Sequence, residues 1–128
     1  MPVRHVFIVD DDPIAVMIMK RLIAKSDFHP SPMPFENGLT VLNHLKGIYT
    51  PADQYVIFLD INMPVMNGWE FLDAITDFAD TGNTIVFLVT SSTDEADRVR
   101  SEQYSLVARY LSKPVSVAAL EELKGSVQ

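Results

Sequence analysis

Short apolar runs alternate along this chain with longer segments of mixed character. Four runs are rich in β-branched and aromatic residues and are too short for a helix, which is typical of strands; they cover residues 6–9, 55–59, 85–89 and 109–111. In the first three runs the apolar residues are continuous rather than alternating with polar ones. Continuous apolar strands are buried on both faces, so the pattern predicts a parallel sheet with a layer of helices on each side.

The segments between the predicted strands begin with residues that favour helix starts. Asp12 and Pro13 supply an N-cap and a first-turn proline to an apolar helix over residues 14–23. Similar signals predict four more helices. One starts at residues 36–38, and the next starts at the capping-box sequence of residues 67–70 and reaches about Phe78. A third starts with a similar capping-box sequence at residues 92–95 and reaches Tyr104, and the last starts at Ser116 and reaches Leu123. Strands that alternate with helices predict a doubly wound α/β fold.

One segment tests this prediction. Pro30, Pro32 and Pro34 fall at every second position, so a strand there would lack amide donors along one side only. Such a strand fits only at the edge of a sheet, which is the place of the second strand in the flavodoxin-like order 2-1-3-4-5. An irregular loop explains the same prolines equally well.

The length and composition favour one soluble domain over residues 1–128. The chain has 128 residues, of which 48% are hydrophobic and 21% charged, values typical of a globular protein. No apolar run is long enough to span a membrane, and the amino terminus leads directly into the first strand without signal-peptide features. Cysteine is absent, which excludes disulfides and thiolate metal sites. We therefore expect a cytoplasmic protein with no membrane partner.

The net charge of -7 bears on the class of partner. Binding to the phosphate backbone of nucleic acid requires a basic surface, so direct nucleic-acid binding is disfavoured.

Acidic residues gather where two predicted strands end. Asp10, Asp11 and Asp12 follow the first strand, and Asp60 follows the strand of residues 55–59. Ligands of open parallel sheets bind beyond the carboxyl ends of the strands. Two carboxylates 4 Å apart repel by roughly 4 kcal/mol at an effective dielectric constant of 20, so such a cluster needs a cation or a raised pKa. Oxygen ligands without His or Cys favour Mg²⁺, whereas Asp12 before Pro13 is better explained as a helix cap.

Two further strand ends carry groups that complement the acids. Thr90 and Ser91 offer hydroxyl donors, and Lys113 offers a compact positive charge. A carboxylate beside Mg²⁺, opposite a hydroxyl and an ammonium group, provides what phosphoryl transfer to a carboxylate oxygen requires. The combination predicts a phosphoacceptor site.

Four blocks in this order resemble the motif set of response-regulator receiver domains, of the stand-alone type similar to the chemotaxis response regulator. The blocks are Val9-Asp10-Asp11, residues 58–64 with Asn67-Gly68, Val89-Thr90-Ser91 and Ser112-Lys113-Pro114. The resemblance spans essentially the whole chain. It implies a five-stranded sheet of order 2-1-3-4-5 and a Mg²⁺ ion bound by Asp11, by the phosphoacceptor Asp60 and by the main-chain carbonyl of Asn62, with Asp10 acting through a metal-bound water.

The same resemblance implies roles for the later blocks. Thr90 and Lys113 would bind the phosphoryl oxygens, the bond between Lys113 and Pro114 would be cis, and Tyr110 would be the aromatic switch residue. Asn62 and Ser92 would tune how water reaches the acyl phosphate. Val115 departs from the pattern, because an aromatic residue commonly follows the Lys-Pro pair.

In such a family the phosphodonor is the phosphohistidine of a sensor histidine kinase or of a histidine phosphotransfer protein, or a small acyl phosphate. Phosphorylation would switch a surface around the fourth helix, fifth strand and fifth helix that binds a downstream effector protein. The helix over residues 93–104 has few apolar residues, which predicts that it is weakly held. The chain would then be no enzyme in the usual sense, but a phosphoacceptor that assists its own phosphorylation and dephosphorylation.

Three alternatives share this reading of the sequence. In the first, the chain would be a relay intermediate that passes phosphate from Asp60 to a histidine phosphotransfer protein. In the second, it would be a scaffold that works without phosphorylation. A phosphohydrolase on a similar sheet is disfavoured, because it needs a second Asp where Asn62 stands.

Overall fold

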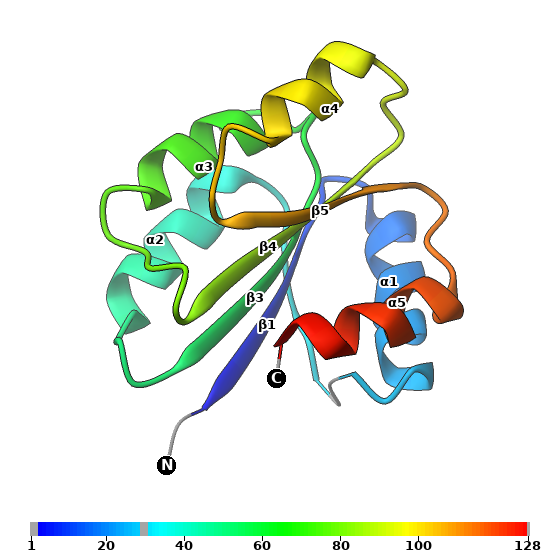
Figure 1. Cartoon of the computed structure of the whole chain (residues 1–128), viewed down its shortest axis with the longest axis horizontal. Helices are drawn as coiled ribbons and strands as arrows, with labels where there is room; N and C mark the ends of the chain where they lie inside the picture. Colours follow the sequence, from blue (N-terminus) through cyan, green and yellow to red (C-terminus); the bar gives the residue numbers. More distant parts are fainter. Residues whose placement is uncertain (1–2, 29–30, 128) are drawn as a thin grey trace.

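The computed structural model describes residues 3–28 and 31–127, and its centre is a five-stranded parallel sheet (Figure 1). The strands are β1 (Arg4–Val9), β2 (Met33–Phe35), β3 (Gln54–Leu59), β4 (Thr84–Thr90) and β5 (Val107–Ser112). Their order in the sheet is β2-β1-β3-β4-β5, and all four pairings are parallel. The predicted fold class and strand order are confirmed.

Helices cover both faces of the sheet. They are α1 (Pro13–Lys25), α2 (Gly38–Ile48), α3 (Gly68–Ile75), α4 (Glu95–Ser101) and α5 (Val117–Leu123), followed by the short 3₁₀ helix η1 (Lys124–Val127). In Figure 1, α2 and α3 lie on one side of the sheet and α1 and α5 on the other, with α4 above α3. None of the helices in the described ranges is long and apolar enough to cross a membrane.

The central strands separate two apolar cores. In β1 the side chains of Phe7 and Val9 pack toward α2 and α3, while those of Val6 and Ile8 pack toward α1 and α5. The same alternation runs through β3 and β4, where nearly every side chain is buried. Each buried aliphatic or aromatic side chain contributes about 1.5–3 kcal/mol of transfer free energy. This two-sided burial explains why the strands are continuous apolar runs.

Pro34 lies in a three-residue edge strand, β2, and Pro32 directly precedes that strand. Among the described residues β2 pairs only with β1, and Pro34 lies opposite Ile8 in the register. Because β2 has a neighbour on one side only, the missing amide of Pro34 breaks no hydrogen bond in the sheet interior. Pro30 lies outside the described residues.

Most helix starts agree with the predictions from sequence. Asp12 and Ser116 cap α1 and α5, and Asn67 forms a capping box with Glu70 at the start of α3. α3 ends at Ile75 rather than near Phe78, and the chain continues in hydrogen-bonded turns.

α4 begins two residues later than the helix predicted over residues 93–104. Its N-cap is Asp94, whose side chain accepts a hydrogen bond from the amide of Ala96, so the helix begins at Glu95. The Ser92 hydroxyl instead donates to Asp97 inside the helix. The helix is also shorter than predicted, because it ends at Ser101 and a turn leads on to Tyr104.

Candidate functional site

Parallel pairing brings the ends of β1 and β3 together. Val9 pairs with Leu59, so the residues that follow them, Asp10 and Asp60, lie side by side. The amide of Asp60 donates to the Val9 carbonyl at 2.9 Å, and the amide of Asp10 donates to the Phe35 carbonyl of the edge strand at 3.0 Å. The backbones of both acids are therefore held by the sheet itself.

Asp10, Asp11 and Asp60 form an acidic cluster. One carboxylate oxygen from each residue lies within 4.8 Å of those of the other two. The side chains of Asp10 and Asp60 are buried, whereas Asp11 is exposed and open to solvent on one side. Oxygen-only donors with one open side fit a hard divalent cation that keeps part of its water shell, as Mg²⁺ does.

Lys113 joins this cluster from the loop after β5. Its ammonium nitrogen lies 2.6 Å from Oδ2 of Asp10 and 3.3 Å from Oδ2 of Asp60. Burial alone would lower the pKa of Lys113, but the hydrogen bond to Asp10 and the charges of both carboxylates outweigh it and raise this pKa. The side chain therefore stays charged and offsets part of the repulsion within the acidic cluster. The bond between Lys113 and Pro114 is cis.

The Asp60 carboxyl has an altered acidity. Burial raises the pKa of Asp60, and the neighbouring Asp10 carboxylate raises it further. The charge of Lys113 and the amide of Ile61, which donates to Oδ1 at 2.8 Å, act in the opposite direction without cancelling the rise. The ionised form of Asp60 therefore costs free energy in the folded protein unless further positive charge binds nearby.

Removal of Lys113 should make this cost larger. In a Lys113→Ala variant we expect the pKa of Asp60 to rise further, because the nearest positive charge is lost while Asp10 remains. A pH titration of the aspartate carboxyl carbons by NMR measures this. An Asp60 resonance that titrates at the same pH in both proteins would contradict the assigned role of the lysine charge. Lys20→Ala, on the exposed surface of α1, is the matched control.

Thr90 and Tyr110 lie beside the cluster rather than in it. Thr90, the last residue of β4, is fully buried and its Oγ1 accepts from the amide of Ser92 at 3.2 Å. Tyr110 on β5 is half-buried, and its hydroxyl donates to the carbonyl of Ser92 at 3.4 Å. Ser92 therefore connects the two predicted switch residues. Asn62, two residues after Asp60, is exposed.

The far end of α4 has its own anchor, which was not predicted from sequence. Tyr104 stacks on Trp69 with ring centroids 5.7 Å apart and donates to Asp73 at 2.7 Å, while the guanidinium of Arg100 lies 4.6 Å from the Trp69 ring centroid. These contacts join α4 to α3. Ser101 is the only buried residue of α4, so side-chain contacts at its two ends determine its position.

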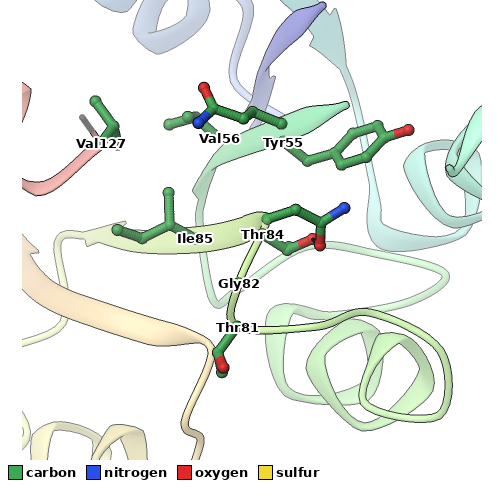
Figure 2. Close-up of a pocket in the computed structure, with 9 residues that line it drawn as sticks. Tyr55, Val56, Thr81, Gly82, Thr84, Ile85 and Val127 are labelled. Atoms are coloured by element: carbon green, nitrogen blue, oxygen red, sulfur yellow. Dashed lines mark hydrogen bonds between the residues drawn. The ribbon is translucent and has the colours of Figure 1, made fainter. Parts of the chain in front are cut away.

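A hollow lies at the end of the sheet opposite the acidic cluster, where β3 and β4 begin (Figure 2). It has a volume of about 90 Å³, and neither carboxylates nor cationic groups are among the residues that line it, which are Gln54, Tyr55, Val56, Thr81, Gly82, Asn83, Thr84, Ile85 and Val127. It therefore lacks the charged groups that phosphoryl chemistry needs. The acidic cluster remains the candidate site.

Fold and site together define a doubly wound α/β domain with an acidic cluster at the carboxyl ends of its strands. Residues 6–124 match the family model of the response regulator receiver domain. The chain therefore belongs to the response regulator receiver family, the signalling domains of two-component systems.

Similar proteins agree with this assignment. Protein PilH of Pseudomonas aeruginosa is 27% identical over 116 residues, which cover 91% of this chain and 90% of PilH. A two-component response regulator from Cytophaga hutchinsonii is 28% identical, with a TM-score of 0.83 over 99% of this chain and 98% of that chain. A response regulator receiver protein from Dyadobacter fermentans is 25% identical, with a TM-score of 0.82 over 94% of each chain.

Proposed function

We propose that residues 1–128 form a single receiver domain in which Asp60 accepts a phosphoryl group with the help of Mg²⁺. The observation that carries the proposal is the setting of Asp60: a buried carboxylate with a raised pKa, beside two further acids and a lysine. A buried carboxylate with perturbed acidity next to a specific charge partner is typical of a functional site. An attacking carboxylate oxygen and a neighbouring cation are the groups that this transfer uses.

The transfer balances as a substitution at phosphorus. A P–O bond forms between phosphorus and an Asp60 oxygen. At the same time the P–N bond of a phosphohistidine, or the P–O bond of a small acyl phosphate, breaks, and its electron pair leaves with the donor. Asp11, Asp60 and the main-chain carbonyl of Asn62 would hold Mg²⁺, with Asp10 binding through water. The ion would neutralise charge on the phosphoryl oxygens. Lys113 and the Thr90 hydroxyl would bind those oxygens, which requires Lys113 to leave part of its present ion pairing.

The signal would be a population shift. When Thr90 turns toward the phosphoryl group, the hydrogen bond from Ser92 to its hydroxyl is lost and the Tyr110 ring can turn inward. The surface of α4, β5 and α5 would then change shape and bind a downstream effector protein. The weak burial of α4 supports such a movement.

An exposed apolar face supports a protein phosphodonor. Ile14, Met17 and Ile18 are 62%, 46% and 46% exposed, and they lie in the first half of α1, directly after the acidic residues. A contiguous apolar patch beside a charged site fits a protein-docking surface. We propose a sensor histidine kinase or a histidine phosphotransfer protein as the donor, in the cytoplasm.

The test is intact mass spectrometry after incubation with Mg²⁺ and acetyl phosphate. We expect the gain of one hydroxylamine-labile phosphoryl group, and no gain when a chelator removes the metal. Binding of beryllofluoride, a phosphoryl mimic, should show the same metal requirement. A protein that gains no phosphoryl group and binds no beryllofluoride would be a scaffold with the appearance of the site and without its chemistry.

A further inference from the structure

Ser92 is the centre of a hydrogen-bond network between the site and α4. Its amide donates to Thr90 Oγ1 at 3.2 Å, and its carbonyl accepts from the Tyr110 hydroxyl at 3.4 Å. Its hydroxyl donates to Oδ2 of Asp97 at 2.8 Å and accepts from the amide of Asp94 at 3.2 Å. One residue thus contacts the Thr90 hydroxyl, the Tyr110 hydroxyl and the first turn of α4.

Asp97 is the one member of this network that belongs to the helix proper. It is half-buried in the first turn of α4, whereas its neighbours Ala96 and Arg98 are exposed. Glu95, the other acid of that turn, forms its side-chain hydrogen bonds with Arg98 within the same helix. Of these two acids, only Asp97 ties the helix to the loop that follows β4.

We propose that Asp97 is a positioning residue, which holds Ser92 and thereby keeps the Thr90 hydroxyl in the arrangement without phosphate. The inference rests on the proposed function. A hydrogen bond to a charged acceptor is stronger than one between neutral groups, so the carboxylate of Asp97 is a firm anchor for the Ser92 hydroxyl. The loop after β4 can follow Thr90 toward a phosphoryl group only if the hydrogen bond between Ser92 and Asp97 breaks.

The direction of the effect follows from linkage. An interaction present only in the arrangement without phosphate lowers the apparent affinity for any ligand that selects the other arrangement. Loss of the Asp97 carboxylate should therefore tighten the binding of a phosphoryl mimic. A residue that merely stabilised the fold would not have this effect.

The experiment is a titration of the full chain with beryllofluoride at saturating Mg²⁺, followed by ¹⁹F NMR. For Asp97→Ala we expect binding about three- to tenfold tighter than in the parent protein, the range that one hydrogen bond provides. Asp97→Asn keeps an acceptor oxygen but loses the charge, so its binding should fall between that of the parent and that of Asp97→Ala. Mg²⁺ affinity without beryllofluoride should be unchanged in both variants.

Glu95→Ala is the matched control, because it removes the same charge from the same turn without touching Ser92. It should leave beryllofluoride binding unchanged. Equal effects of Glu95→Ala and Asp97→Ala, or unchanged or weaker binding in Asp97→Ala, would overturn the inference while the proposed function stands. Failure of the parent protein to bind beryllofluoride would overturn the proposed function, and this inference with it.

Discussion

An Asp60→Asn variant is expected to take up no phosphoryl group from acetyl phosphate, yet to unfold at a higher temperature than the parent protein when divalent cations are absent. The first effect follows because a neutral amide oxygen is a poor nucleophile at phosphorus. The second follows because the parent site holds ionised Asp60 within 4.8 Å of two other acids, with the single ammonium of Lys113 between Asp60 and Asp10. Removal of one negative charge relieves that repulsion.

The stability gain should depend on pH in a defined direction. The pKa of Asp60 is raised by burial and by Asp10, so the folded state binds the proton more tightly than the unfolded chain, whose reference value is 3.8. The ionised group therefore costs stability above its folded pKa. That cost declines as the pH falls below this value and is gone below the reference value of the unfolded chain. Water still screens part of the carboxylate, so we expect a gain of roughly 2–5 °C in Tm at neutral pH.

Thermal unfolding followed by circular dichroism at several pH values measures this difference. Asp77→Asn, an exposed acid just after α3, removes the same charge elsewhere and should leave Tm unchanged. Added Mg²⁺ should stabilise the parent protein more than the Asp60→Asn variant, because the proposed metal site of the variant lacks one carboxylate. If the variant proves less stable than the parent at neutral pH, the hydrogen bond from Ile61 to ionised Asp60 outweighs the repulsion.

The strands were the most predictable part of the fold. Burial on both faces demands continuous apolar residues, and these demands are visible in the chain itself. The same holds for the acidic cluster and for Lys113, because parallel strands bring their carboxyl ends to one edge. In each case a general rule about parallel sheets was sufficient.

The choice between an edge strand and a loop at Pro34 was not a local question. The decision depends on pairing with Ile8, which no pattern within the segment encodes. The predicted start of α4 was wrong for a related reason. Both Ser92 and Asp94 are good caps, and the contact between the Ser92 hydroxyl and Asp97 leaves the capping role to Asp94.

Contacts between distant side chains were beyond the reach of sequence patterns. Tyr104 and Asp73 are 31 residues apart and come together only because α3 and α4 lie side by side. The stacking of Tyr104 and Arg100 on Trp69 has the same origin. Such contacts depend on tertiary packing, and they determine where α4 lies.

A Gly68→Ala substitution is expected to destabilise the protein by about 1–3 kcal/mol and to slow its phosphorylation. A β-carbon on Gly68 would lie 2.6 Å from the carbonyl oxygen of Asp60 and 2.9 Å from the Cα of Ile61, both of which are backbone atoms. The amide of Gly68 also donates to the Ile61 carbonyl at 2.8 Å, so α3 begins in direct contact with the loop that follows Asp60. Relief of the clash requires movement of that loop or of the helix.

Gly47→Ala provides the comparison, because a β-carbon there would meet nothing within 4 Å and the residue lies in the exposed last turn of α2. Alanine has the higher helix propensity, so this variant should be more stable by about 0.5–1 kcal/mol. Denaturant unfolding of both variants, with phosphorylation rates from acetyl phosphate, measures the contrast. If Gly68→Ala is as stable as the parent and only its phosphorylation slows, the clash is relieved by movement of the loop after Asp60 and not by movement of α3. If both properties are unchanged, the close approach of α3 to Asp60 has no part in holding the site.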